Sequence, residues 1–327
     1  MKQRALGKTG ISVSEVGLGT WQIGGSWGRI SEYNALAILE NAMHNGVTFY
    51  DTADVYGDGR SESLIGQFFK PKSSRIFIAT KLGRSGNPGW PDNFTLDAMR
   101  THTENSLQRL GLETLNLTQL HCVPTEVLRQ GEIFDSLRTL QSEGKIEHFG
   151  ASVESMEEAL ICLEQDGLAS LQIIFNIFRQ KPIVELFEKA QQKGVALIVR
   201  LPLASGLLSG KFSTSTEFDD DDHRHFNRDG QVFNVGETFA GLPFEKGVEF
   251  ASKIKPLVPK NMTMARMALR WVLDFPAVTT VIPGASCLAH VSSNVSASSL
   301  PPLTPELHSQ LTALYQNEVK DHIRGPY

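Results

Sequence analysis

The fold is indicated first by the stretch Val47-Thr48-Phe49-Tyr50-Asp51-Thr52-Ala53-Asp54-Val55-Tyr56-Gly57. It begins as a short β-branched and aromatic run, which is typical of a buried strand, and then places a carboxylate, Asp51, and a phenol, Tyr56. Two later segments have the same form, because Lys81 and His121 each end a short apolar run. Since the carboxyl ends of parallel strands meet at one mouth of a β/α barrel, we predict that these four side chains lie together there.

Short apolar runs alternate with amphipathic segments along almost the whole chain, which is the pattern of β/α units. We predict eight strands, at residues 16–20, 48–51, 76–80, 115–120, 146–151, 171–175, 196–201 and 278–282. Between most of them we predict helices, at residues 31–45, 61–69, 95–110, 127–142, 156–165 and 182–192. Because eight strands close a barrel of this kind, the predicted fold is an α/β (β/α)8 TIM barrel.

Some parts of the chain depart from the regular alternation. Residues 4–13 have the polar and glycine positions of a β-hairpin, which would plug the other end of the barrel. After the seventh strand, residues 212–240 show little periodicity, and a loop of this length is usually functional or disordered. Two extra helices, at residues 244–254 and 263–275, then precede the last strand. We find no linker or repeated block, so residues 1–327 are predicted to form a single domain.

The composition predicts a soluble globular protein. Hydrophobic residues make up 41% and charged residues 20% of the 327 residues, which allows a large core. The net charge of −5 argues against nucleic acid as an obligate partner. The N-terminus is polar and no apolar run reaches the roughly 20 residues that span a bilayer, so we expect a cytoplasmic protein. The cysteines, Cys122, Cys162 and Cys287, are too widely spaced to suggest a zinc site or a disulfide framework.

A phenol, an ammonium, a carboxylate and an imidazole at one barrel mouth form a proton-donating group suited to a carbonyl oxygen. Each of these side chains also has an ordinary explanation by itself. A tyrosine at a strand end is more often a packing residue, a lysine and an aspartate more often pair at the surface, and a histidine more often lies satisfied in the core. Their occurrence together at successive strand ends favours the functional interpretation.

The chain also carries a series of short motifs in a fixed order. They are Gly17-Leu18-Gly19-Thr20-Trp21, Asp51-x-Ala53-x-x-Tyr56-Gly57 followed by Ser61-Glu62, Lys81, Leu110-Gly111-Leu112, Leu120-His121, Gly144-Lys145-Ile146-x-x-x-Gly150, Pro202-Leu203-Ala204-Ser205-Gly206-Leu207-Leu208-Ser209-Gly210-Lys211 and Ile282-Pro283-Gly284-Ala285. From residue 6 to about residue 294 the chain resembles the aldo-keto reductase superfamily. It resembles the bacterial-type members related to the potassium-channel β-subunit-like and general stress reductase branches. Each motif is weak alone, but their order and spacing make the resemblance specific.

The resemblance implies NADPH-dependent reduction of an aldehyde or ketone in a (β/α)8 barrel. Carried over to this sequence, Tyr56 would be the general acid, although a free phenol titrates near pH ~10 and holds its proton at neutrality. Lys81 would favour the phenolate, and Asp51 would hold and orient Lys81 through a buried ion pair. His121 would position and polarise the substrate carbonyl.

The cofactor site has no Rossmann fingerprint, because Gly17-x-Gly19-x-x-Gln22 lacks the third glycine. Residues 206–211 do not match the phosphate loop of a nucleotide triphosphatase either, because the spacing is short and Phe212 replaces the serine or threonine. The backbone N–H groups of this small-residue loop, together with Lys211, could nevertheless hold the pyrophosphate of a dinucleotide, as the equivalent loop does in the family.

The resemblance implies a larger set of cofactor contacts. Ser152 and Gln172 would bind the nicotinamide carboxamide, Arg200 would stack on the nicotinamide ring, and Asn294 would contact the adenine. The complete predicted set is Thr20, Trp21, Asp51, Ser152, Gln172, Arg200, Pro202, Leu203, Ser205, Gly206, Leu208, Gly210, Lys211, Gly284, Ser286, His290 and Asn294.

Two departures from the family pattern bear on the cofactor. The frequent Ser-Asn pair is Ser152-Val153 here, so one carboxamide contact is lost or supplied elsewhere. The stretch from Gly284 to His290 lacks the lysine or arginine that often binds the 2′-phosphate of NADPH, and Ser286 and His290 would replace it less strongly. We therefore predict that NADP(H) is favoured, with NAD(H) as a weaker alternative.

The loops give a less specific prediction of the substrate contacts. Besides Tyr56 and His121, the predicted contacts are Trp21 and Trp27, which lie in a glycine-rich stretch near the mouth. Trp90 is a weaker candidate, since loop packing explains it equally well. The substrate itself is predicted only as a small carbonyl compound.

The acidic and histidine residues at positions 219–225 could suggest a metal site. Nothing in their spacing fixes a ligand geometry, so we predict a solvated, mobile surface loop and no metal. The C-terminal residues 321–327 are expected either to fold over the mouth or to fray.

Two other functions stay open as alternatives. Some barrels of this family, such as the potassium-channel β subunits, act mainly as regulators, so the chain could be a nicotinamide-binding sensor with little turnover. A barrel aldolase or isomerase would use Lys81 as a Schiff base, but the neighbouring Asp51 would stabilise the charged lysine and oppose this. The working direction and the choice between a monomer and a homo-oligomer are left open.

Overall fold

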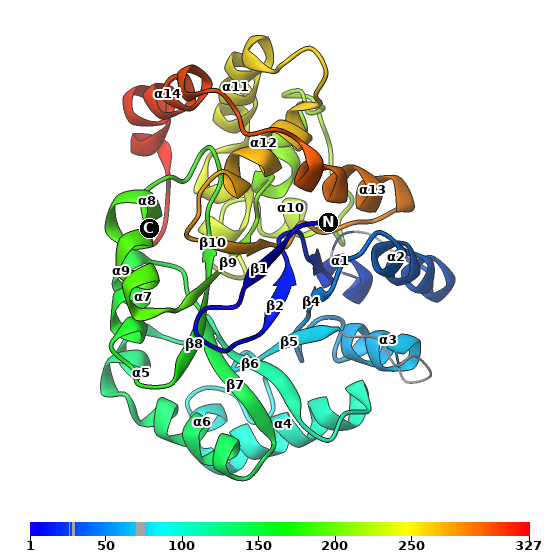
Figure 1. Ribbon diagram of the computed structural model, residues 1–327, viewed down its shortest axis with the longest axis vertical. Helices are drawn as coiled ribbons and strands as arrows, with labels where there is room; N and C mark the ends of the chain where they lie inside the picture. The colour runs from blue at the N-terminus through cyan, green and yellow to red at the C-terminus, as the bar shows by residue number, and fades with distance from the viewer. Residues whose placement is uncertain (26, 28–29, 70–75) are drawn as a thin grey trace.

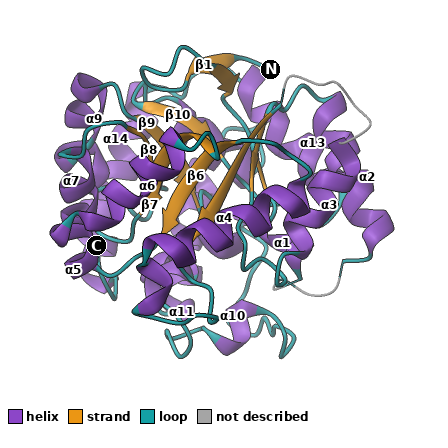
Figure 2. Ribbon diagram, turned by 90° about the horizontal axis from the view of Figure 1, so that it is seen from below, coloured by secondary structure: helices purple, strands orange, loops and turns teal. Residues whose placement is uncertain are grey.

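The computed structural model describes residues 1–25, 27, 30–69 and 76–327. Within these residues, eight parallel strands are hydrogen-bonded in chain order: β3 (Leu18–Gly19), β4 (Phe49–Asp51), β5 (Phe77–Leu82), β6 (Leu115–His121), β7 (Ile146–Ser152), β8 (Leu168–Ile174), β9 (Ala196–Arg200) and β10 (Val278–Val281). Parallel bridges from Val16 to Val281 and from Gly19 to Gly284 join the two ends of the sheet and close it into a barrel. Helices surround the strands (Figures 1 and 2), so the predicted (β/α)8 TIM barrel is confirmed.

The helices mostly follow the strands that they cover. They are α1 (Trp21–Gly24), α2 (Glu32–His44), α3 (Arg60–Phe69), α4 (Leu96–Leu110), α5 (Thr125–Gln130), α6 (Glu132–Ser142), α7 (Met156–Leu163), α8 (Pro182–Glu185), α9 (Phe187–Lys193), α10 (His223–Phe226), α11 (Phe244–Ile254), α12 (Met264–Leu273), α13 (Leu288–Ser296) and α14 (Pro305–Leu314). The two extra helices predicted before the last strand are α11 and α12, whereas α1, α10, α13 and α14 lie outside the predicted set. None of the described helices combines the length and the apolar character needed to span a bilayer.

Two of the predicted helices are wrong as single elements. The segment at residues 127–142 is divided at Gly131, whose φ of 85° is left-handed and separates α5 from α6. The segment at residues 182–192 is divided at Leu186, whose φ of −123° lies outside the helical range between α8 and α9. Apolar residues on both sides of each break belong to the same core, so the periodic pattern continues across it.

The N-terminal hairpin consists of β1 (Gln3–Ala5) and β2 (Ser12–Ser14), which pair antiparallel as predicted. Leu6 and Val13 are fully buried and pack with Phe49 and Phe77, which begin β4 and β5. The hairpin therefore closes the amino-terminal end of the barrel (Figure 1), and the carboxyl ends of the strands are left to form the mouth.

Within the long segment at residues 212–240, the predicted solvated loop at residues 219–225 is exposed only in part, since Asp219–Asp221 and His225 are exposed but Asp222 and His223 are buried. Asp222 is 4% exposed and its side chain caps α10, while His223 is fully buried. The His223 ring centroid lies 4.7 Å from that of Trp21 and 4.2 Å from that of Trp27. The segment therefore packs over the mouth of the barrel.

The C-terminal tail does not fray, because it packs along the same segment. Arg324 Nε donates to the backbone oxygen of Gly241 at 3.0 Å, and Arg324 Nη1 pairs with Asp229 at 2.7 Å. The tail also reaches the barrel, where the amide of Lys181 donates to the Tyr327 hydroxyl at 3.0 Å. The tail thus fastens the long segment to the start of α8.

The packing of α3 against α4 leaves no room for a side chain at Gly66. A Cβ added there would lie 2.3 Å from the backbone oxygen of Arg109. We expect Gly66→Ala to lower the free energy of unfolding by about 1–3 kcal/mol, because the helices would have to separate. Urea unfolding measures this change, with Gly86→Ala as the control, since its Cβ would meet no atom within 4 Å. Equal losses in both variants would contradict the close helix contact.

Candidate active site

The structure brings the four polar residues of the successive strand ends together. Lys81 Nζ donates to Asp51 Oδ2 at 2.7 Å and to the Tyr56 hydroxyl at 3.2 Å. Lys81 Nζ also donates to the backbone oxygen of Thr52 at 2.8 Å. The His121 ring lies nearly perpendicular to the Tyr56 ring, with 5.8 Å between the centroids. Asp51, Lys81 and His121 belong to β4, β5 and β6, and Tyr56 lies in the turn between β4 and α3.

A close approach of two glycines fixes the turn that carries Tyr56. Gly57 has a φ of 62°, and a Cβ there would lie 2.0 Å from the backbone oxygen of Gly24. A Cβ on Gly24 would in turn lie 2.8 Å from the carbonyl carbon of Tyr56. Only glycine fits at both positions, so these two residues bring α1 against the turn and hold the phenol at the mouth.

Burial and neighbouring charges together set the protonation of the site. Burial raises the pKa of Tyr56, and the adjacent Lys81 partly opposes that rise. Burial alone would lower the pKa of Lys81, but Asp51 and Tyr56 more than offset it and the pKa of Lys81 is raised. Burial, followed by the charges of Arg84 and Lys81, holds the pKa of His121 well below its usual range. The site at neutral pH therefore contains a protonated phenol, a charged lysine and a neutral imidazole.

A cavity of about 470 Å³ runs from Tyr56 and His121 past the end of β9 to α13. Most of the residues predicted to bind the cofactor line this cavity: Trp21, Asp51, Gln172, Arg200, Pro202, Leu203, Ser205, Gly206, Lys211, Gly284, Ser286, His290 and Asn294. Gln172 Nε2 donates to Asp51 Oδ1 at 2.7 Å. This hydrogen bond links β8 to the carboxylate that pairs with Lys81.

Four residues of the predicted cofactor set do not line the cavity. Thr20 is fully buried and donates its hydroxyl hydrogen to the backbone oxygen of Asp51 at 2.7 Å. Ser152 lies behind Gln172, with its hydroxyl 3.4 Å from the Gln172 side-chain oxygen. Leu208 is fully buried in the core, and Gly210 caps the short helix at residues 204–209 with a φ of 70°. These four support the cavity wall from behind.

The loop after β9 has an unusual backbone. Leu201, Ala204 and Ser205 have φ values of 52°, 48° and 53°, a left-handed conformation that is costly for residues other than glycine. The Ser205 hydroxyl accepts a hydrogen bond from the backbone amide of Phe239 at 3.0 Å, so the long segment at residues 212–240 is hydrogen-bonded to the loop. Such strain is retained where surrounding contacts over-determine it, which is common at ligand sites.

The far end of the cavity carries little positive charge. The Ser286 hydroxyl lies 3.2 Å from His290 Nδ1, and Asn294 Nδ2 donates to the backbone oxygen of Gly284 at 3.2 Å. Burial, together with the charge of Lys211, lowers the pKa of His290. Lys211 is therefore the charged side chain that reaches this end among the described lining residues.

A second cavity opens on the other side of Tyr56 and His121. Trp21 forms one wall and stacks on Tyr56, with 5.9 Å between the ring centroids and 17° between the planes. Trp90, which is 66% exposed, also lines this cavity. Trp27 instead lines the first cavity and meets the edge of Trp21 at 5.7 Å. Trp21 thus lines both cavities, whereas Trp27 lines the first, and the two predicted substrate contacts touch each other.

Several lining residues have no place in the predicted set. Arg84 and Glu154 lie just beyond Lys81 and Ser152, so the same strand-end argument could have found them. Glu237 comes from the short helix at residues 235–237, lines both cavities and has no periodic or motif signal in the sequence.

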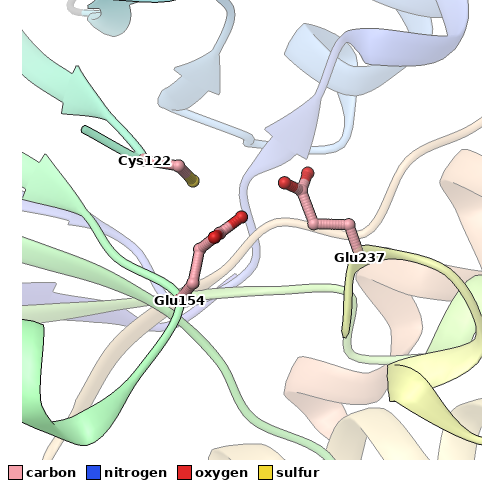
Figure 3. A group of neighbouring side chains, drawn as sticks. All are labelled: Cys122, Glu154 and Glu237. Atoms are coloured by element: carbon pink, nitrogen blue, oxygen red, sulfur yellow. The ribbon is translucent and has the colours of Figure 1, made fainter. Parts of the chain in front are cut away.

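Cys122, Glu154 and Glu237 point toward one another (Figure 3), and their ligand atoms lie within 4.8 Å of each other. The carboxylates already have guanidinium partners, because Arg84 contacts both glutamates and Arg200 contacts Glu237. Burial also raises the pKa of the Cys122 thiol to about 11, so the thiolate that a metal requires is disfavoured. We therefore interpret the two glutamates as partners of the guanidinium groups.

The chain matches the family model described as the Aldo/keto reductase family over residues 15–316. It is 26% identical over 324 residues to "Uncharacterized oxidoreductase YqkF" of Bacillus subtilis, with 98% of each chain covered. It is also 26% identical over 295 residues to "Aldo-keto reductase yakc [NADP(+)]" of Schizosaccharomyces pombe, covering 88% of this chain and 84% of that one. Among solved structures, the holo form of aldo-keto reductase AKR11C1 from Bacillus halodurans matches with a TM-score of 0.78 and 26% identity, covering 96% of each chain. This chain therefore belongs to the aldo/keto reductase family and is an NAD(P)H-dependent oxidoreductase built on a (β/α)8 barrel.

Proposed function

We propose that this oxidoreductase reduces an aldehyde or ketone to an alcohol, with the proton delivered from Tyr56. The observation that carries the proposal is the buried chain of contacts from Asp51 through Lys81 to the Tyr56 hydroxyl at one end of a cofactor-sized cavity. The bound nicotinamide would supply the hydride. The chain's own residues would hold the carbonyl and provide the proton.

The geometry of Lys81 directs the phenolic hydrogen. An ammonium has three N–H groups, and those of Lys81 are taken by Asp51, the Thr52 backbone and Tyr56. Since the Tyr56 oxygen accepts a hydrogen bond from Lys81, its own hydrogen is free to point into the cavity that Tyr56 lines. The positive charge beside the oxygen then stabilises the phenolate as the proton leaves.

His121 would orient the substrate as a neutral donor. A neutral imidazole carries one N–H, and His121 lines both cavities next to Tyr56. A carbonyl oxygen placed between the phenol and this N–H would receive two hydrogen bonds, which polarises the carbonyl carbon for hydride attack. Because the imidazole is uncharged, it leaves the proton transfer to Tyr56.

The first cavity fits a dinucleotide on the residues that the structure places there. The left-handed loop after β9 exposes backbone N–H groups beside Lys211, which would hold the pyrophosphate. Arg200 would lie against the nicotinamide ring and Asn294 against the adenine. Gln172 would bind the carboxamide, with Ser152 orienting Gln172 from behind. The buried side-chain oxygen of Gln22, which has no partner among the described residues, faces the same cavity near Gly284.

We propose NADP(H) as the preferred cofactor, in line with the NADP(+) in the name of the yeast relative. Because Ser286 and His290 are uncharged, the preference over NAD(H) should be modest. Ser286→Arg would add a guanidinium at the far end of the cavity, and we expect it to raise the ratio of kcat/KM for NADPH over NADH by about tenfold or more. Initial rates with both cofactors measure this ratio.

Ser292→Arg is the matched control for this prediction. Ser292 is an exposed residue on the same helix, α13, and is not a lining residue of the cavity. We expect its cofactor ratio to equal that of the wild type. A similar rise in both arginine variants would show that only overall charge is responsible.

We also propose that residues 1–327 act as one domain and that the protein works in the cytoplasm. The packing of the C-terminal tail against both Gly241 and Lys181 supports the first proposal. The three unpaired cysteines fit a reducing compartment and support the second.

The test of the proposed function is the loss of reduced-nicotinamide absorbance over a panel of aromatic aldehydes, methylglyoxal and simple ketones. Turnover of at least one carbonyl compound, with the matching alcohol as product, is the expected result. Tight NADPH binding without turnover on any of them would instead favour a cofactor-binding sensor.

A further inference from the structure

Four charged side chains meet where the two cavities join. They are Arg84, which follows β5, Glu154, which follows β7, Arg200, which ends β9, and Glu237 from the long segment. Arg84 Nη2 lies 2.5 Å from Glu237 Oε1 and 3.3 Å from Glu154 Oε1. Arg200 Nη1 lies 3.4 Å from Glu237 Oε2. We call these four residues the charge cluster.

The charge cluster belongs to the substrate side of the site. Arg84, Glu154 and Glu237 line the second cavity together with Tyr56 and His121. The side chains are 26%, 16% and 5% exposed, so solvent screens their charges only partly. An imbalance of charge in the cluster would therefore change the electrostatic interaction with a substrate whose carbonyl lies at Tyr56.

The two carboxyl groups differ in protonation because of their surroundings. Burial raises the pKa of Glu154 to about 7, and the neighbouring Glu237 carboxylate adds to this rise. Burial would also raise the pKa of Glu237, but Arg84 and Arg200 bring it down to about 2. Glu237 is thus ionised at all working pH values, and Glu154 is the member of the pair that titrates near neutrality.

The other groups facing Glu154 do not change charge in this range. Arg84 and Arg200 stay protonated, and Cys122 stays a neutral thiol. Arg179 lies behind Glu154 and donates to its backbone oxygen at 3.3 Å. The ionisation of the Glu154 carboxyl is therefore what changes the charge of the cluster near neutral pH.

We propose that Glu154 and Glu237 set the charge of the substrate cavity and so select carbonyl substrates by charge. This proposal rests on the proposed reductase function. With both carboxylates ionised, the two guanidinium groups are matched and the cavity favours uncharged carbonyl compounds. With Glu154 protonated, one guanidinium charge is left over, and a carbonyl compound that bears a carboxylate can pair with Arg84.

The protonation of Glu154 sets how the preference for an anionic substrate depends on pH. Below pH 7 Glu154 is protonated, so the cavity has an excess positive charge and accepts anions better. Above pH 7 Glu154 is ionised and that advantage is lost. The relative preference for an anionic substrate should therefore fall as the pH rises through about 7.

The experiment compares 4-carboxybenzaldehyde with 4-nitrobenzaldehyde, and the same pair with the substituent at position 3. The carboxylate and nitro groups have the same planar shape but differ in charge, and neither titrates between pH 5.5 and 8.5. The ratio of kcat/KM for the carboxylate over the nitro compound is measured across this range with saturating NADPH. Ionisations that affect both substrates, including that of Tyr56, cancel in the ratio.

We expect the wild-type ratio to fall as the pH rises through neutrality. Glu154→Gln should hold the ratio at its acidic value at every pH, because no titrating carboxyl is left. Glu237→Gln should raise the ratio by about tenfold or more above pH 7 and flatten its pH dependence, because one guanidinium is left unmatched and Glu154, freed of the neighbouring carboxylate, ionises at lower pH. Arg84→Met should lower the ratio at acidic pH by removing the group that pairs with the anion.

Glu157→Gln is the matched control, since Glu157 lies three residues from Glu154 but has a side chain that is 64% exposed. Its ratio should follow that of the wild type. A flat wild-type ratio, or a Glu154→Gln profile identical to the wild type, would overturn the proposal even if Glu237→Gln does not fold. Reduction of the nitro compounds in that case would leave the reductase function standing, whereas no turnover of any substrate would refute the reductase function itself.

Discussion

Tyr56→Phe is expected to lower kcat by between about 10²- and 10⁴-fold, because it removes the group that donates the proton. The ring stays in place, stacked on Trp21 and beside His121, so the shape of the cavity is retained. We therefore expect the dissociation constant for NADPH, measured by quenching of tryptophan fluorescence, to change less than threefold. Steady-state assays with an aromatic aldehyde measure the loss of turnover.

Tyr50→Phe provides the control for the loss of a phenol. The Tyr50 hydroxyl donates to the backbone oxygen of Val47 at 3.3 Å, and its ring packs in the core against Phe69, away from the mouth. This variant should keep the wild-type kcat. If Tyr56→Phe is as active as Tyr50→Phe, the assignment of Tyr56 as the proton donor is wrong.

Lys81→Met is expected to abolish turnover and to lower the free energy of unfolding by about 3–5 kcal/mol, because it leaves a buried carboxylate without its charged partner. Asp51 is 3% exposed, so bulk water would compensate only poorly for the missing ammonium. Urea unfolding and the aldehyde assay measure the two effects separately. An unchanged unfolding midpoint would mean that Asp51 and Lys81 do not form the buried pair.

The double variant Asp51→Asn with Lys81→Met separates stability from catalysis. Without either charge the buried site is neutral, so much of the stability should return while turnover stays absent. Lys145→Met is the control, since its partner Glu104 has a side chain that is 52% exposed. A pair with an exposed partner contributes about 0–1 kcal/mol, so this variant should unfold almost as the wild type does.

Some residues of the charge cluster lie at the same strand ends as residues that we propose for catalysis and cofactor binding. Lys81 lies in β5 and Arg84 just after it, and Ser152 ends β7 with Glu154 just after it, so short intervals along the chain separate the residues proposed for proton transfer and cofactor binding from those proposed for substrate selection. Glu237 joins them from a segment more than 80 residues beyond Glu154 in the sequence. The contacts of the C-terminal tail with Gly241 hold that segment in place.

The barrel and its proposed catalytic residues could be predicted because both depend on local patterns. A buried strand shows itself as a short apolar run, and the barrel brings the ends of all such runs to one mouth. Tyr56, Lys81 and His121 are therefore placed once the strands are recognised. The loop at residues 202–211, which we propose to hold the cofactor pyrophosphate, was located from small residues that follow a strand together with the family resemblance.

Local patterns did not reveal where helices break or what covers the mouth. Gly131 interrupts a continuous apolar stripe by its left-handed backbone, which is set by the packing of α5 and α6 rather than by periodicity. His223 has a polar, acidic sequence context that indicates solvent, yet it lies buried against Trp21 and Trp27.

The sequence by itself therefore determined the eight strands and the residues at their ends, because the apolar runs that mark buried strands are local patterns. It also determined the order of the strands, because the strands of a (β/α)8 barrel pair in the order in which they occur in the chain. Only the tertiary structure decided that Glu237 reaches Arg84 and Arg200, and that the tail fastens the segment that carries it. These contacts join residues far apart in the chain through side-chain charge and packing, which leave no repeating pattern in the sequence.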